Sequence, residues 1–138
     1  MSVDPTLVGR SFGPTAPFDV TAEHVAEFAA AIGADYQAGD PAPVTFPIVV
    51  AFQAMTALME DAAVGITLER VVHGEQRFDY SRPVRVGDRL AATLYVDTLR
   101  SIGGADIIGT RSTIADADGH LVCTAKATLV YRGPEEAS

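Results

Sequence analysis

The hydrophobic and polar positions follow their clearest pattern between Pro47 and Val64. No charged residue occurs from Ile48 to Met59, and the polar residues Gln53, Thr56 and Glu60 recur at intervals of three and four. On a helix these three side chains form one narrow stripe, and the remaining surface is apolar. An apolar run of about a dozen residues is too short to cross a bilayer. We therefore expect a central helix that is buried on most sides and enclosed by a sheet.

The first third of the chain predicts one amphipathic helix between extended segments. Residues 1–20 contain three prolines and two small apolar groups, a pattern that is typical of short edge strands. Thr21 has the side chain of an N-cap, and apolar residues recur at helical spacing until Gly33. We expect a helix over 22–32 and then a constrained, proline-rich loop over 34–47 that leads into the central helix.

Beyond Gly65 the hydrophobic period changes from helical to alternating. Four antiparallel strands are predicted: alternating runs over 71–80 and 89–98, a less regular run over 107–114, and a last strand that ends at Tyr131. The expected apolar face of the first strand comprises Val72, Gly74, Gln76, Phe78 and Tyr80, and that of the last comprises Leu121, Cys123, Ala125, Ala127, Leu129 and Tyr131. The predicted fold class is α+β, one hot-dog domain over 1–138 in which a curled antiparallel sheet wraps a long apolar helix. Residues 134–138 form the expected frayed tail.

Composition and charge narrow the classes of function. The 138 residues are 48% hydrophobic and carry a formal net charge of −8, without any basic run. Such a chain lacks the positive surface that binds nucleic acid or anionic membranes. Cys123 is the single cysteine, so neither an internal disulfide nor a cysteine metal site is expected. The N-terminus has no basic leader and no apolar core of signal length, which predicts a soluble cytoplasmic protein.

Two motifs carry a resemblance to a known family. The segment VVHGEQRFDYSRPVRVGDRL (71–90) resembles the F-x-x-x-R-P-V-x-x-G-D-x-L segment of MaoC-like dehydratases, and its HGEQRF opening is similar to their N-terminal, FAS1-like branch. The segment PAPVTFPIVVAF (41–52) resembles the A-P-x-T-F-P start of the hot-dog helix in that branch. The family comprises (R)-specific enoyl-thioester hydratases and 3-hydroxyacyl-thioester dehydratases that act on CoA or acyl-carrier-protein substrates. The resemblance therefore implies a role in acyl-thioester chemistry.

The catalytic motif of that family implies a partner for this chain. The motif reads roughly G-D-x-N-P-x-H, and the corresponding stretch here is IGADYQAGDPAPV (32–44). Asp35 falls within one position of the expected aspartate, whereas no histidine occurs between His24 and His73. The family includes heterodimers in which one subunit supplies the catalytic pair and the other accommodates the acyl chain. The resemblance thus implies a substrate-holding subunit, in a heterodimer with a motif-bearing MaoC-like subunit or in a homodimer.

Asp35 and His73 are the candidate catalytic residues. Removal of water across a C2–C3 bond needs a base near the C2 proton and an acid for the 3-hydroxyl. On a strand His73 shares a face with Glu75, so the two either orient one another as an acid–base pair or belong to a solvent-facing polar row. Asp35 is either a remnant of the catalytic acid or a loop carboxylate.

Four residues near the central helix are candidates for substrate binding. Thr45 and Phe46 stand at its entrance, where backbone N–H groups can face a thioester oxygen. Phe52 and Met55 lie within the helix, beside the expected apolar groove for the acyl chain.

Two polar groups have both a structural and a functional interpretation. Gln76 shares the expected apolar face with Phe78, so its amide either joins Gln53 of the central helix in a buried hydrogen-bond network or contacts substrate. The arginines at 82, 85 and 89 either meet the phosphates of CoA or phosphopantetheine, or pair with acidic side chains.

The leading hypothesis is a hydratase or dehydratase subunit that holds a CoA or acyl-carrier-protein thioester. A non-catalytic acyl-thioester-binding homodimer and a hot-dog thioesterase are the alternatives. No metal and no redox cofactor is implied, because CoA or phosphopantetheine arrives with the substrate. The apolar composition and the open sheet edges predict a dimer that pairs edge to edge, with the long helices side by side.

Overall fold

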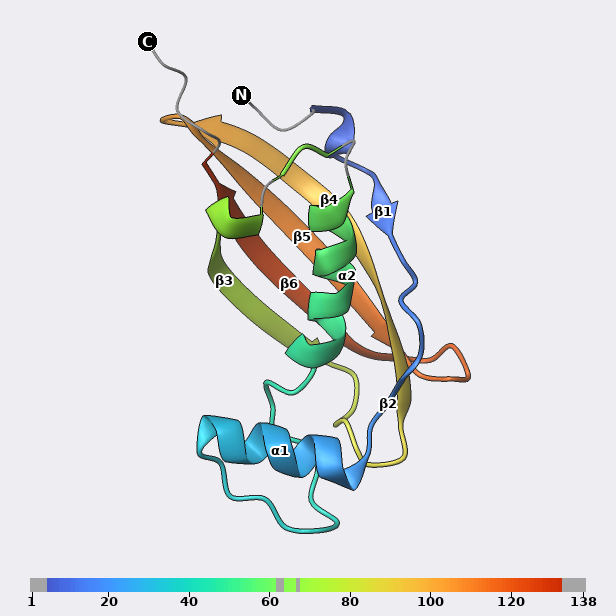
Figure 1. The fold of residues 1–138 in the computed structure, drawn as a ribbon. Coiled ribbons are helices and arrows are strands. Elements are labelled where there is room, and N and C mark those ends of the chain that lie inside the picture. The colour runs from blue at the N-terminus through green and yellow to red at the C-terminus, as the bar shows by residue number, and fades with distance from the viewer. Residues whose placement is uncertain (1–4, 62–63, 67, 133–138) are drawn as a thin grey trace.

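A curled antiparallel sheet wraps around one helix, and a second helix lies across the lower end of that helix (Figure 1). The computed structural model describes residues 5–61, 64–66 and 68–132, so the expected frayed tail lies outside the described residues. The helices are α1 (Ala22–Ile32) and α2 (Ile48–Glu60), with short 3-10 turns at Pro5–Leu7 and Leu68–Arg70. The strands are β1 (Ser11–Phe12), β2 (Phe18–Asp19), β3 (Val71–Tyr80), β4 (Arg89–Ile102), β5 (Ala105–Ala115) and β6 (Leu121–Tyr131). The predicted α+β architecture is confirmed.

The sheet has the order β1-β4-β5-β6-β3, and β2 also pairs with β4. All of its pairs are antiparallel. Gly103 and Gly104 connect β4 to β5 with φ values of 59° and 83°, the left-handed conformation that a two-residue hairpin turn requires. Strand β3 ends the order and pairs within the described chain with β6 alone. One long edge of the sheet is therefore open.

Helix α2 buries one side against the sheet and exposes the other. Its buried side chains are Val50, Ala51, Ala54, Met55, Leu58 and Met59. Phe52 is 47% exposed and Gln53 is also exposed, so the expectation of a helix buried on most sides is wrong for the single chain. The helix ends at Glu60, earlier than the predicted stop near Gly65, because Asp61 adopts an extended conformation. Neither described helix combines the length and apolar character needed to cross a bilayer.

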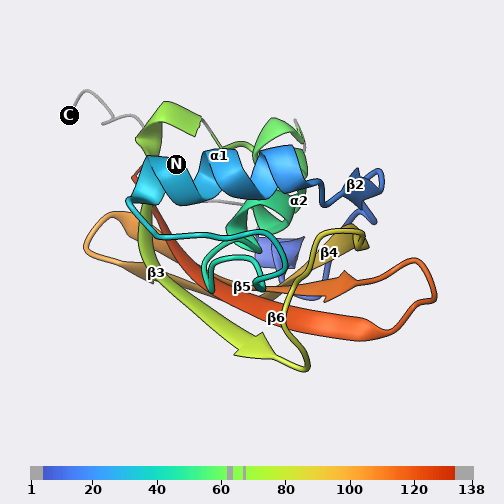
Figure 2. The same cartoon turned by 90° about the horizontal axis from the view of Figure 1, so that it is seen from below.

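Helix α1 has the predicted bounds and covers the end of the wrapped core (Figure 2). The Thr21 hydroxyl accepts the His24 N–H at 3.1 Å, and Gly33 takes the left-handed conformation, with φ 71°, that ends the helix. Phe28 packs edge to face on Phe46, with ring centroids 5.4 Å apart. This contact fixes α1 against the segment that leads into α2.

Register shifts occur in three of the described strand pairs, and two of them break the predicted alternation. A register shift in β3 lies between His73 and Glu75, so Val72, expected on the apolar face, is 63% exposed. A second shift lies in the β5–β6 pairing, and Leu121 is 46% exposed while Val122 is buried. A bulge adds one residue to one strand, which reverses the face that the residues beyond it present. The predicted faces are therefore wrong at these two strand starts.

Candidate functional site

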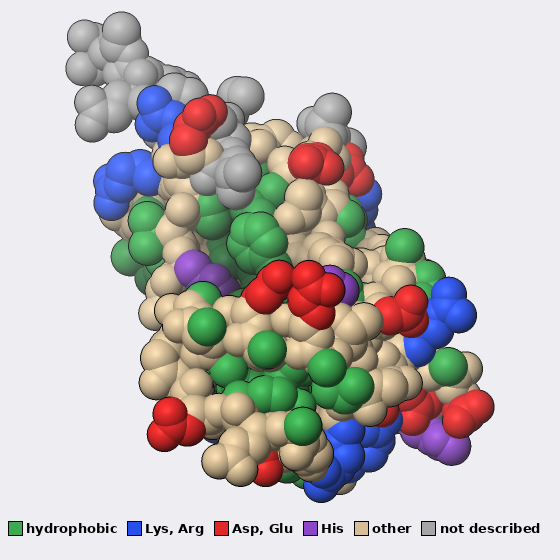
Figure 3. All heavy atoms as spheres, turned by 60° about the horizontal axis from the view of Figure 1, so that its bottom comes forward, with side chains coloured by type: hydrophobic (Ala, Val, Ile, Leu, Met, Phe, Trp, Pro, Cys, Tyr) green, Lys and Arg blue, Asp and Glu red, His purple; other side chains and the backbone are tan. Residues whose placement is uncertain are grey.

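A groove lies between β3 and the two helices, beside the start of α2. Its volume is about 610 Å³, and its lining residues are Phe28, Ile32, Thr45, Ile48, His73, Gly74, Glu75, Gln76 and Phe78. Hydrophobic side chains gather on the face of the molecule that carries α1 (Figure 3). Three of the predicted site residues, Thr45, His73 and Gln76, line this groove, although they come from distant parts of the sequence.

A hydrogen-bonded pair, His73 and Gln76, supplies polar groups to the groove. His73 Nε2 lies 2.8 Å from Gln76 Oε1, and Gln76 Nε2 donates to the Arg77 carbonyl at 3.2 Å. Because the second bond fixes the direction of the amide, its oxygen faces His73, which therefore donates from Nε2. The pair thus places polar groups beside the apolar side chains of the groove.

The partners of these two side chains differ from those predicted. The bulge in β3 places His73 where it bonds to Gln76, whereas one of the two alternatives from the sequence paired it with Glu75. Gln53 is exposed on α2, and the hydroxyl of its neighbour Thr56 donates to a carbonyl of its own helix at 2.9 Å. The predicted buried network between Gln53 and Gln76 is therefore wrong.

Four other predicted site residues lie outside the lining of this groove. Asp35 is exposed in the loop that follows α1. The Phe46 side chain is 1% exposed in the core, and its N–H donates to the Pro43 carbonyl at 2.8 Å. Met55 is 2% exposed and packs in the core, whereas Phe52 is half-exposed on α2.

Backbone donors at the start of α2 are already engaged in tight turns. The Ile48 N–H donates to the Thr45 carbonyl at 3.1 Å, and the Val49 N–H donates to the Phe46 carbonyl at 3.0 Å. Of the two residues predicted to face a thioester oxygen, Thr45 is the one on the groove wall.

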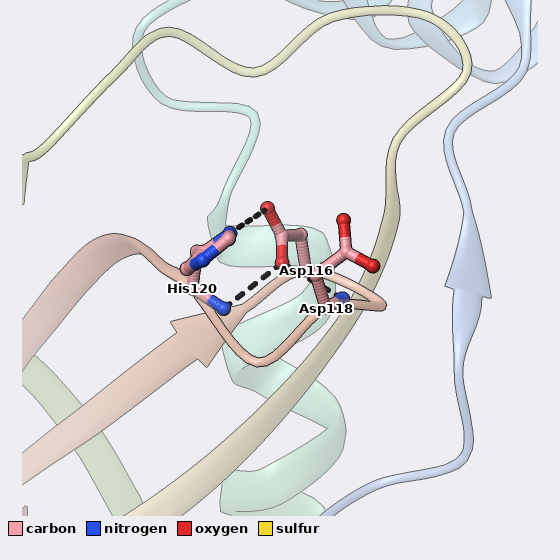
Figure 4. Close-up of side chains that lie close together, drawn as sticks. All are labelled: Asp116, Asp118 and His120. Carbon is pink, nitrogen blue, oxygen red and sulfur yellow. Dashed lines mark hydrogen bonds and ion pairs between the residues drawn. The ribbon is translucent and has the colours of Figure 1, made fainter.

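A second polar cluster lies beyond the other end of β3, and Figure 4 shows its members Asp116, Asp118 and His120 in the turn between β5 and β6. The Arg82 guanidinium donates to both Asp88 oxygens, at 2.9 and 3.2 Å, and to Asp116 at 3.3 Å. Asp116 Oδ1 accepts the backbone N–H groups of Asp118 and His120, each at 3.0 Å. The His120 N–H foremost, and then Arg82, hold the pKa of Asp116 below its ordinary value, although partial burial opposes them.

Ion pairs and hydrogen bonds already engage Arg82 and Asp116 within this cluster. Ligand atoms of Asp116, Asp118 and His120 lie within 4.8 Å of one another, a spacing that suits a cation. Both Asp116 oxygens, however, already accept protein donors. Arg89 likewise pairs with Asp19 at 3.5 Å. For Arg82 and Arg89 the structure supports the ion-pair alternative over phosphate binding.

Comparisons with known proteins agree with this architecture. The sequence profile described as "FAS1-like, dehydratase domain region" matches residues 6–125. The chain belongs to this family of FAS1-like, MaoC-like dehydratases. It is 43% identical to a UPF0336 protein (SCO4636) of Streptomyces coelicolor, over 99% of this chain and 100% of that protein.

Solved structures confirm the hot-dog fold of this dehydratase family member. The HadBC (3R-hydroxyacyl-ACP dehydratase) complex from Mycobacterium tuberculosis aligns with a TM-score of 0.80 and 29% identity, over 94% of this chain and 99% of that chain. A MaoC-like dehydratase aligns with a TM-score of 0.74 and 27% identity, over 91% of this chain and 42% of that longer chain.

The dehydratase motif has a structural explanation at several positions. Phe78 forms part of the groove wall, and Arg82 joins the loop before β4, through Asp88, to the turn between β5 and β6, through Asp116. Gly87 has a φ of 100°, which favours glycine. The wall residues Phe28, Ile32 and Ile48 were not predicted, because helical spacing shows only that such side chains share a face.

Proposed function

We propose that this chain is the substrate-holding subunit of an (R)-specific enoyl-thioester hydratase or 3-hydroxyacyl-thioester dehydratase. In dehydration a base removes a C2 proton, and an acid protonates the departing 3-hydroxyl, which releases water and leaves the C2–C3 double bond. The observation that carries the proposal is a groove with apolar walls that contains the His73–Gln76 pair. Asp35 is not among the residues that line this groove. The motif histidine is also missing from residues 34–47.

The groove residues have distinct roles in this proposal. The walls formed by Phe28, Ile32 and Ile48 hold the acyl chain by burying its methylenes. Thr45 contacts the substrate from the groove wall, and Gln76 with His73 holds the thioester end of the substrate by hydrogen bonds. Asp35, outside the groove, is assigned no proton-transfer role.

A second subunit supplies the acid and base in this proposal. The open edge of β3 offers unpaired backbone donors and acceptors to a neighbouring strand. The partner is a MaoC-like subunit with an intact D-x-N-P-x-H motif, and the pair forms a dimer. Similarity to one chain of the HadBC complex, at 29% identity, supports this assignment.

Co-expression with such a partner tests the proposal. The complex should hydrate crotonyl-CoA at least about 10²-fold faster than the chain alone, because positioned general acids and bases contribute about 10²–10⁴-fold. Substitution of the partner's motif aspartate or histidine should abolish that activity. Rapid hydration by this chain alone would overturn the assignment. His73→Ala and Asp35→Asn would then be the first variants to assay.

A further inference from the structure

A second pocket lies beyond the end of β3, next to the groove. Its volume is about 440 Å³, and its lining residues are Pro41, Ala42, Val44, Tyr80, Ser81, Arg82, Pro83 and Val84. Most of these side chains are apolar. The charge of Arg82 is paired with Asp88 and Asp116, so the pocket is suited to an uncharged, apolar group.

The pocket and the groove adjoin along two chain segments. Thr45 lines the groove and its neighbour Val44 lines the pocket. Phe78 lines the groove, and Tyr80, two residues further along β3 on the same face, lines the pocket. The boundary between the two spaces therefore lies where Tyr80 meets Val44.

A hydrogen bond between the partly exposed Tyr80 and the exposed Val44 lies at that boundary. The Tyr80 hydroxyl donates to the Val44 carbonyl, which links β3 to the loop before α2. Burial raises the pKa of the Tyr80 hydroxyl, so it remains a donor across the physiological range. The tyrosine ring and its bond thus form a barrier between groove and pocket.

The polarity of the groove gives a direction to a bound acyl thioester. Its polar pair, His73 and Gln76, lies earlier on β3, and the apolar Phe78 follows toward Tyr80. A thioester held at the polar pair directs its hydrocarbon tail along Phe78 to the barrier.

We propose that Tyr80 limits the length of the acyl chain that the groove accepts, and that the pocket behind it receives longer chains once the ring is removed. This inference rests on the proposed function, because it requires that the groove binds an acyl thioester. Each methylene that becomes buried raises affinity about fourfold. The affinity of the wild-type chain should therefore rise along an acyl series and then level off where the tail reaches Tyr80.

Calorimetric titration of the full chain with butyryl-, octanoyl-, dodecanoyl- and palmitoyl-CoA tests this inference. In Tyr80→Ala the rise should continue to longer chains, so that affinity for the first acyl-CoA beyond the wild-type limit increases about tenfold or more, the gain from about two further methylenes. Tyr80→Phe keeps the ring and removes the hydrogen bond, so it should give a smaller gain. If Tyr80→Ala does not fold, Tyr80→Leu serves as the shortened variant.

Two further variants control for indirect effects. Tyr95→Ala removes a tyrosine from β4, where the ring stacks with Arg111, and should leave the chain-length limit unchanged. Ser81→Phe fills the pocket from its exposed rim. It should have no effect in the wild-type background and should cancel the gain in Tyr80→Ala.

The outcomes separate this inference from the proposed function. A wild-type limit that Tyr80→Ala leaves unchanged would overturn the role of Tyr80 while the substrate-holding function stands. A gain in Tyr80→Ala that Ser81→Phe does not cancel would contradict the pocket as the space that receives the tail. Absence of binding for every acyl-CoA would overturn both.

Discussion

Two polar clusters, one along the first half of β3 and one beyond its end, differ in how their polar groups are hydrogen-bonded. Arg82, Asp88 and Asp116 bind one another and the neighbouring backbone, which leaves them committed to the fold. His73 and Gln76 share one hydrogen bond at a groove with apolar walls. The first cluster links the loop before β4 to the turn between β5 and β6, and the second can bind a ligand.

Because of this difference, substitutions in the first cluster should lower stability, whereas substitutions in the second should weaken ligand binding. Loss of a member of a closed cluster leaves a charged partner unpaired and lowers stability. Loss of a member of an open pair beside a groove removes a contact that a ligand uses. Stability and binding measurements on matched variants therefore distinguish the two.

The largest expected effect is on stability, in Arg82→Leu. Two carboxylates lose their partner, and the free energy of unfolding should fall by about 1–2 kcal/mol, since Arg82 is 37% exposed and solvent screens part of the interaction. Chemical denaturation followed by circular dichroism measures it. Arg89→Leu is the control, because its ion pair with Asp19 is largely exposed and should contribute little. Equal losses in both variants would contradict the comparison.

The rate of Cys123 alkylation reports whether the cluster of Arg82, Asp88 and Asp116 restrains the neighbouring part of β6. The thiol is fully buried beside Tyr80, and burial raises its pKa to about 11, so it should react slowly with iodoacetamide at neutral pH. Arg82→Leu should accelerate the reaction up to about tenfold, the factor that corresponds to 1.4 kcal/mol of easier opening. Gln76→Leu should leave the rate unchanged. A rate that Arg82→Leu does not alter would show that the cluster does not restrain this part of β6.

Gln76→Leu should weaken ligand binding more than stability. Loss of its hydrogen bonds should lower the affinity for octanoyl-CoA by about two- to tenfold, because a net hydrogen bond contributes about 0.5–1.5 kcal/mol. Gln53→Leu is the matched control, since Gln53 is exposed on α2 and does not line the groove. Titration calorimetry and denaturation on both variants test the prediction, which fails if Gln53→Leu weakens binding equally.

The smallest expected effect is a pH dependence in Asp116→Asn. The folded pKa of Asp116 lies below its ordinary value of 3.8, so its contribution to stability is fully present above that pH. It is lost as the pH falls through the folded pKa. Wild type should therefore be more stable than Asp116→Asn at neutral pH, and the difference should shrink below about pH 3.8. Denaturation curves at pH 7 and pH 3 measure it, and a difference that grows in acid would contradict the assignment.

Local patterns were sufficient for most of the fold. The helix over Ala22–Ile32 was predicted to the residue, because an N-cap threonine and a left-handed glycine mark its two ends. The bounds of β3 and the end of β6 at Tyr131 were predicted equally well from alternation and turn residues. The bulges were not, since an extra residue in a strand becomes visible only from the pairing partner that it fails to match.

The candidate site depended more on tertiary structure. The sequence by itself determined the family, the helices and strands, and the missing histidine in residues 34–47. The tertiary structure decided that His73 bonds to Gln76, that Met55 is core and that Tyr80 contacts the Val44 carbonyl. The physical reason is the distance along the sequence over which each effect acts. Propensity, capping and hydrophobic period act over a few residues, whereas a groove wall requires segments distant in sequence to approach within van der Waals contact.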